Sequence, residues 1–168
     1  NGNNLAPTFG DLDSDGDLDA VVGDWNGKLY YCENSGTPES PSFLYKGQFL
    51  DTDVGGLAHP ALGDLDLDGD LDLIVGQDDG LIYYFINIGT SSQSILELQS
   101  ENFFPNTNLG VQAAPYLADL DDDGDLDILL GNADGELFFA EQEKDIWSVT
   151  KIANFPYAGP KTSPAAAH

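Results

Sequence analysis

The sequence contains no arginine and a single cysteine, Cys32, among its 168 residues. One cysteine allows no disulfide bond within the chain, so the fold must be held together in another way. Five lysines stand against 30 acidic residues, and the formal net charge is −25. A surface of this charge repels nucleic-acid phosphates and anionic lipid headgroups, so neither is expected as a partner. Divalent cations are the natural counter-charge.

Long apolar runs are missing as well. No run approaches the roughly 18 residues that indicate a membrane-spanning helix, so no membrane insertion is expected. A chain this acidic would be expected to be disordered if apolar residues were scarce. However, 41% of the residues are apolar and 11% are aromatic. The composition therefore predicts one folded domain with a core of its own.

One acidic motif occurs three times, as DLDSDGDLD at 11–19, DLDLDGDLD at 64–72 and DLDDDGDLD at 119–127. The flanking residues are similar too, with APTFGD, HPALGD and APYLAD around the start of each motif and apolar runs ending in glycine after it. The chain thus repeats one unit. The predicted boundaries are about 5–57 for the first blade, 58–112 for the second and 113–161 for the third, with the start of a fourth repeat at 162–168.

Each unit is predicted to form four short antiparallel strands. The first strand, for example Thr8–Leu12, precedes the acidic motif, and the second follows it. Dipeptides that favour two-residue hairpin turns then come before the third strand: Asn26-Gly27, Asp79-Gly80 and Asp134-Gly135. Four strands in a repeat of this length are typical of a propeller blade. The predicted fold is therefore an all-β, β-propeller-type array of three four-stranded antiparallel blades.

A propeller usually needs about four to eight blades to close its ring. Three blades leave two sheet faces uncovered. The array is therefore expected to be a segment of a larger propeller, or a unit that self-associates through its open blade edges. The last residue, His168, is either native or a remnant of a tag.

The acidic motif has the spacing of a calcium loop. Calcium takes about six to eight oxygen ligands, and aspartates at positions one, three and five of D-x-D-x-D-G-x-x-D can point inward from a curled backbone. The glycine at position six allows the chain to reverse. The predicted side-chain ligands of three Ca²⁺ sites are Asp11, Asp13, Asp15 and Asp19; Asp64, Asp66, Asp68 and Asp72; and Asp119, Asp121, Asp123 and Asp127. The predicted carbonyl ligands at position seven belong to Asp17, Asp70 and Asp125, whose side chains are expected to point to solvent, as is that of Asp122.

Other interpretations of the motif are weaker. A helical calcium hand needs an acidic residue at position twelve, which here is Val22, Val75 or Leu130. Magnesium keeps its waters and demands a stricter octahedron, and zinc prefers His and Cys ligands, which are missing near the loops. A metal-free acidic turn stays open for one copy. Three copies with the same acid spacing favour a metal, because crowded carboxylates repel one another.

The three loops, set in β-hairpins and spaced by one blade, resemble the FG-GAP/VCBS repeat family, which includes the propeller of integrin α-subunits. The family's FG pair is Phe9-Gly10 in the first unit, and its later glycine matches Gly23. The equivalents in the other units are Leu62-Gly63, Leu117-Ala118, Gly76 and Gly131. The resemblance covers nearly the whole chain and implies an extracellular, calcium-stabilised propeller that mediates adhesion or ligand recognition.

The resulting hypothesis is a non-enzymatic, secreted or cell-surface calcium module for adhesion, recognition of a protein or glycan ligand, or extracellular assembly. The alternatives are a lectin-like carbohydrate-binding propeller and a non-catalytic accessory domain of a secreted hydrolase or lyase. No Ser/His/Asp or Cys/His set supports catalysis, because the only histidines are His59 and His168. Trp25 stands beside the hairpin turn where the other units carry Asp78 and Ala133, so it is the candidate ligand-binding residue.

Overall fold

The computed structural model describes residues 4–143 and 146–155, and in these residues twelve strands form three four-stranded antiparallel sheets. Blade 1 contains β1 (Ala6–Gly10), β2 (Asp19–Gly23), β3 (Leu29–Asn34) and β4 (Phe43–Gln48). Blade 2 contains β5 (His59–Gly63), β6 (Asp72–Gly76), β7 (Ile82–Asn87) and β8 (Leu96–Ser100). Blade 3 contains β9 (Ala114–Ala118), β10 (Asp127–Gly131), β11 (Glu136–Glu143) and β12 (Ile146–Asn154). The strands of each sheet follow chain order, which confirms the predicted array of three four-stranded blades.

The described residues include no helix long and apolar enough to cross a membrane. The expected start of a fourth repeat at 162–168 and the terminal His168 lie outside the described residues.

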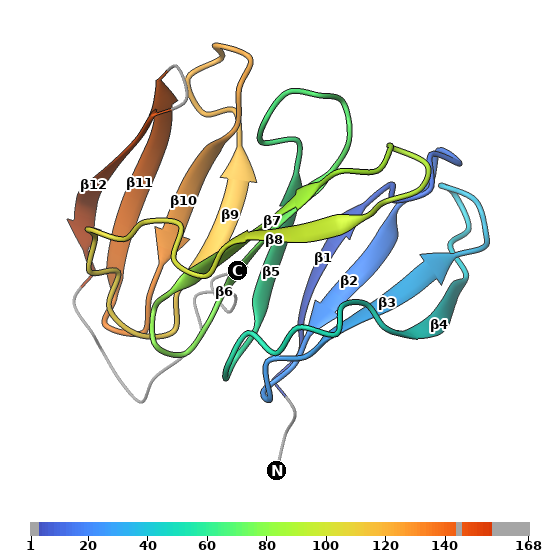
Figure 1. Ribbon diagram of the computed structural model, residues 1–168, viewed down its shortest axis with the longest axis horizontal. Helices are drawn as coiled ribbons and strands as arrows, with labels where there is room; N and C mark the ends of the chain where they lie inside the picture. Colours follow the sequence, from blue (N-terminus) through green and yellow to red (C-terminus); the bar gives the residue numbers. More distant parts are fainter. Residues whose placement is uncertain (1–3, 144–145, 156–168) are drawn as a thin grey trace.

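The blades fan out from their first strands. Figure 1 shows β1, β5 and β9 next to one another in the middle of the molecule, with the later strands of each blade running outward. Each of these inner strands hydrogen-bonds to one neighbour within its own sheet, the second strand of the blade. This arrangement is that of a propeller, in which the first strands surround the axis.

The inner strands begin two residues earlier than the sequence predicts, at Ala6 rather than Thr8. Pro7 pairs with Val22 inside the strand, and proline is tolerated there because an edge strand has one side that needs no N–H donor. The strand also ends earlier, at Gly10. Leu12 belongs to the acidic loop, where its N–H donates to the side-chain carboxylate of Asp19, the first residue of β2, rather than to a backbone carbonyl.

Two apolar clusters lie between the blades. One joins blades 1 and 2 and includes Val21 and Leu73, and the other joins blades 2 and 3 and includes Ile74 and Ile128. Leu73 and Ile74 are neighbours in β6 but face opposite clusters, because successive side chains of a strand alternate between the two faces of the sheet. Both faces of blade 2 are therefore covered, and residues 73–75 of β6 are all apolar and fully buried.

The connections between the second and third strands differ from the predicted two-residue turns. In blade 1 the connection spans residues 24–28, where Gly27 has a φ of 80° but Asn26 is not in the left-handed region. A two-residue type I′ turn would need both residues there. Instead, the carboxylate of the buried Asp24 accepts hydrogen bonds from the N–H groups of Asn26 and Lys28. Gln77 and Asn132 occupy the same position in the other blades and accept from the N–H groups of Asp79 and Asp134.

Replacing a residue between two blades tests this arrangement. Ile74 is fully buried, so Ile74→Ala is expected to lower the free energy of unfolding by about 2–5 kcal/mol, since it leaves a cavity in the cluster. Ile88→Ala is the matched control because Ile88 is 57% exposed, and its effect should stay within about 0.5 kcal/mol. Urea denaturation measures both. Equal losses in the two variants would contradict the described blade contact.

Candidate metal centres

The three acidic loops occupy equivalent places in the three blades. Each connects the inner strand of its blade to the second strand, over residues 11–18, 64–71 and 119–126. The three inner strands point in the same direction along the axis. The loops that follow them therefore lie at the same end of the array (Figure 1). The sequence motif is thus repeated in space as well as along the chain.

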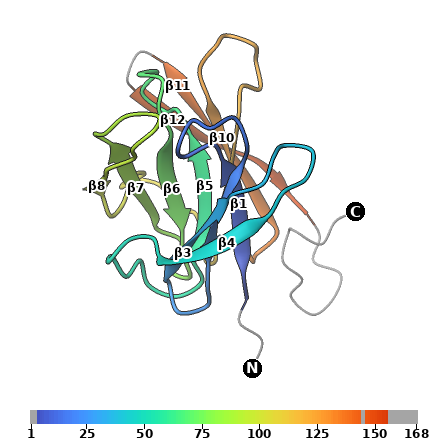
Figure 2. The same ribbon diagram turned by 90° about the vertical axis from the view of Figure 1, so that its right-hand side faces the viewer.

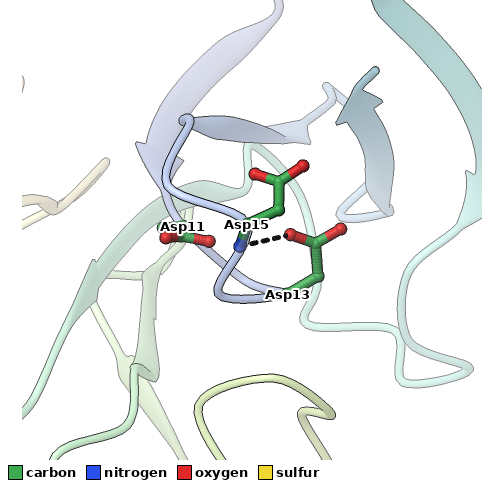
Figure 3. Close-up of side chains that lie close together, drawn as sticks. All are labelled: Asp11, Asp13 and Asp15. Carbon is green, nitrogen blue, oxygen red and sulfur yellow. Dashed lines mark hydrogen bonds between the residues drawn. The ribbon is translucent and has the colours of Figure 1, made fainter. Parts of the chain in front are cut away.

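Each loop gathers three carboxylates at positions one, three and five. In each triple, one oxygen per residue lies within 4.8 Å of the other two. The triples are Asp11, Asp13 and Asp15; Asp64, Asp66 and Asp68; and Asp119, Asp121 and Asp123. Figure 3 shows the first triple around the curled loop, with the Asp15 N–H donating to Asp13. All nine of these residues are among the predicted ligands.

Backbone geometry keeps each loop curled. The glycine at position six has a φ of 93–99° in the three loops, which is the reversal that the sequence predicts there. Its N–H donates to the carboxylate at position one, over 3.1 Å between Gly16 and Asp11. Position four is also left-handed, with a φ of 63° at Leu67 and 64° at Asp122. A bulky side chain such as that of Leu67 is unfavourable in this region, and the motif itself does not predict this conformation.

Burial and like charge act together on the loop carboxylates. Burial raises the pKa of Asp13, and the nearby charges of Asp15 and Asp19 raise it further. The pKa values of Asp66 and Asp121 are raised by the same two causes. Among the described residues, no loop aspartate has a lysine partner, since Lys46 pairs with Glu33 and Lys151 with Glu136. No ion pair within the described part therefore offsets the repulsion.

Several buried carboxylate oxygens have no hydrogen-bond partner among the described residues. They are Oδ1 of Asp11, Asp17, Asp70 and Asp127. Asp17 is 5% exposed and Asp70 is 7% exposed, so the expectation that these two side chains point to solvent is wrong. Asp125 is half-buried, while Asp122 is exposed as expected. A buried oxygen without a donor is costly, and a cation in the loop would supply the missing partner.

The aspartate at position nine is outside the oxygen triples and holds the blade together. The Asp19 carboxylate accepts hydrogen bonds from the N–H of Leu12 at 3.2 Å, the N–H of Asn34 at 2.7 Å and the hydroxyl of Tyr31 at 2.9 Å. Asp72 accepts the same three bonds from Leu65, Asn87 and Tyr84. Burial raises the pKa of Asp72 to about 6. This residue thus ties the loop to the third strand, a role that the sequence did not reveal.

Blade 3 departs from this pattern. Phe139 replaces the tyrosine of the other blades and has no hydroxyl to donate, and Gln142 replaces the asparagine. Asp127 keeps the hydrogen bond from the Leu120 N–H. Its Oδ1 has no partner within the described residues, although Asp127 is 1% exposed. In this blade the ninth carboxylate therefore retains a free buried oxygen that can face a metal ion.

The residues present fit a hard divalent cation. The donors at each loop are carboxylate oxygens, the ligands that calcium prefers. Asp11, Asp13 and Asp15 would hold the ion in blade 1, with their equivalents in the other two blades. The carbonyl role of Asp17, Asp70 and Asp125 and the ligand role of Asp19, Asp72 and Asp127 stay predictions.

A family model described as an FG-GAP-like repeat matches the chain twice, at residues 11–75 and 64–130. The chain belongs to the FG-GAP-like repeat family. Each match runs from the first aspartate of one loop into the strand that follows the next loop. The FG-GAP-like repeat therefore spans the contact between successive blades, and the chain is a β-propeller-type repeat module. No curated protein matches it.

The other residues singled out in the sequence lie apart from the loops. Trp25 is 53% exposed in the connection between β2 and β3, which keeps it available as a ligand-binding residue. His59 lines a cavity of about 500 Å³ together with residues such as Pro60 and Ala114, and burial lowers its pKa. Cys32 is a half-buried free thiol in β3.

The tyrosine hydroxyls provide a test of the anchoring role of position nine. Tyr31→Phe and Tyr84→Phe each remove one donor to a buried carboxylate and should lower the free energy of unfolding by about 0.5–1.5 kcal/mol. Phe139→Tyr is the reciprocal variant, because it restores the donor in blade 3, and it should not lower stability. Urea denaturation in EDTA measures all three. A loss in Phe139→Tyr as large as in the other two variants would contradict the assigned role.

Proposed function

We propose that the chain is an extracellular calcium-binding propeller module that serves adhesion, ligand recognition or assembly and has no catalytic activity. The observation that carries the proposal is the threefold repetition of a crowded carboxylate triple, together with at least one buried carboxylate oxygen without a donor in each nine-residue motif. One such loop could be an acidic turn. Three in register, in a chain with a formal charge of −25, favour a bound cation.

Calcium is favoured over other cations by the donors. Each loop offers oxygen ligands alone, which suits calcium and not zinc. Calcium accepts variable geometry with about six to eight ligands, whereas magnesium requires a near-ideal octahedron. A calcium ion would relieve the mutual repulsion of the three carboxylates and satisfy the free oxygens of residues such as Asp17.

The extracellular assignment is supported by the family, whose repeats are typically extracellular. Sites built on an exposed loop also suit a compartment where calcium is abundant, since calcium modules outside cells bind with dissociation constants of about 10⁻⁴–10⁻³ M. Under this proposal calcium has a structural role, and the protein or glycan ligand binds to the surface of the module.

The absence of catalytic activity is supported by the surroundings of the one described histidine. His59 lies among apolar residues such as Leu57 and Pro60, where burial favours its neutral form. The paired carboxylates are accounted for by the metal loops. A lectin-like module and an accessory domain of a hydrolase or lyase are the alternative roles, and binding to a glycan array in calcium would favour the first of these.

Calcium titration tests the proposal. By isothermal titration calorimetry the chain should bind three calcium ions, and the melting temperature should rise with calcium. At a hundredfold excess over Kd, each site should add about 2.7 kcal/mol to the free energy of unfolding. Asp13→Asn, Asp66→Asn and Asp121→Asn should each remove one site, because each deletes a charged oxygen of one triple.

Asp79→Asn is the matched control. Asp79 is exposed and lies in a hairpin connection, where blade 1 carries Asn26. The variant changes the charge by the same amount but leaves the three loops intact, so the stoichiometry should remain three. An unchanged melting temperature in EDTA and in excess calcium would refute the structural role of the metal.

A further inference from the structure

The two leucines of each acidic motif lie on opposite sides of the blade. At position two, Leu12 and Leu65 are each 5% exposed and contribute to the cluster shared with the following blade. At position eight, Leu71 and Leu126 pack into the cluster shared with the preceding blade. The acidic loop of blade 2 therefore contributes one side chain to the contact with the following blade and one to the contact with the preceding blade.

The same positions are exposed where a blade has no neighbour. Leu120 is the position-two leucine of blade 3 and is 52% exposed, and Leu18 is the position-eight leucine of blade 1 and is 56% exposed. The residue is leucine in every case, and the difference is that no described blade packs against Leu18 or Leu120. Both ends of the described array thus present a surface that is buried between blades elsewhere.

Blade 1 exposes further side chains at positions that are packed against a neighbour in blade 2. We use the name "leading face" for the surface formed by Phe9, Leu18, Phe43 and Tyr45, which are 49–63% exposed. The strand register shows which residues of blade 2 occupy the same positions, and these residues pack against blade 1. They are Leu62, Leu71, Leu96 and Leu98. In Figure 2 blade 1 lies nearest the viewer and no other described strand covers it.

Blade 3 presents the opposite half of the contact. We call trailing face the surface formed by Leu120, Leu129, Leu137 and Phe139, all exposed or half-buried. Its counterparts in blade 1 are Leu12, Val21, Leu29 and Tyr31, and the first three of these are buried against blade 2. The leading and trailing faces are thus the two complementary halves of an interface that occurs twice within the chain.

We propose that two copies of this chain join head to tail, with the leading face of each on the trailing face of the other, and close a six-bladed ring. Contacts between unlike surfaces form either closed rings or open filaments. Two copies of three blades fall within the range of about four to eight blades that propellers use, whereas three copies exceed it. A second copy therefore covers both exposed faces at once.

At one position the residue in the proposed contact between two copies differs from the residue in the two contacts within the chain. A Cβ at Gly10 would lie 2.7 Å from Cδ1 of Leu71, and one at Gly63 would lie 2.6 Å from Cδ1 of Leu126. Ala118 stands at this position in blade 3 and would face Leu18 of the second copy. A Cβ would also lie 3.1 Å from Cδ1 of Leu62 at Gly10 and 2.8 Å from Cδ1 of Leu117 at Gly63, and the counterpart of these two leucines in the second copy is Phe9. The Leu18 side chain can rotate away from the added methyl group, and the proposed contact requires a shift of the Phe9 ring as well.

The mass of the full chain in solution tests the proposal. Sedimentation equilibrium with excess calcium and about 0.15 M salt, which limits repulsion between the acidic chains, should give twice the 18.0 kDa of one chain. Leu18→Asp and Leu120→Asp place a charge on the leading and trailing face, respectively. Each should weaken association at least about tenfold. Calcium binding to the monomer is measured in parallel, so failure to associate is distinguished from failure to bind calcium.

Leu67→Asp is the matched control. Leu67 is 61% exposed at position four of the second loop, outside both faces, and blade 3 carries Asp122 there. This variant should remain dimeric. A mixture of Leu18→Asp and Leu120→Asp should form a heterodimer, because one leading face and one trailing face remain intact in the pair.

Three results would overturn the proposal. They are a monomeric mass for the calcium-bound wild-type chain, growth into species larger than a dimer, and dimers that persist in Leu18→Asp and Leu120→Asp. The last result would assign association to pairing of the outer strands β4 and β12 instead of the blade faces.

Discussion

Crowding of like charge is the constraint on which the other features of this protein depend. Three carboxylates lie within 4.8 Å of one another in each of three loops, and no lysine of the described part neutralises them. The loops also contain oxygens that are buried without a donor. Burial of unpaired charge costs several kcal/mol unless a counter-charge is supplied. A cation at each loop resolves the repulsion and the missing hydrogen bonds together, which is why the account places calcium at the centre of the fold.

The loops connect this constraint to the packing of the blades. The ninth aspartate of blades 1 and 2 binds the loop to the third strand through a backbone N–H and a tyrosine hydroxyl. The leucines at positions two and eight enter the apolar clusters on either side. A change in loop conformation therefore alters both the sheet and its contacts with neighbouring blades. The proposed metal binding, the stability of the blade and the contact between blades therefore depend on the same nine-residue motif.

Much of this organisation could be predicted from the sequence, because the repeat and its period are local patterns. The three blades, the order of their strands and the nine aspartates of the triples were identified in this way. The burial of Asp17 and Asp70 could not be predicted from the sequence, because it depends on how the connection after β3 or β7 folds over the loop. The connections that begin at Asp24, Gln77 and Asn132 are longer than the sequence predicts for a similar reason: a buried polar side chain replaces the tight turn that Asn-Gly and Asp-Gly suggest. The roles of Leu12 and Leu18 depend on which blade lies on each side, and no local pattern contains that information.

A crystal structure of the full chain grown with calcium, with anomalous diffraction data to locate the ions, is the decisive test of calcium binding by the three loops. We expect one ion in each loop, bound by the aspartates at positions one, three and five at about 2.3–2.6 Å. The free oxygens of the buried aspartates should lie within reach of an ion or of a water bound to it. Ordered loops with water alone among the carboxylates would contradict the claim, as would calcium ions bound elsewhere on the acidic surface.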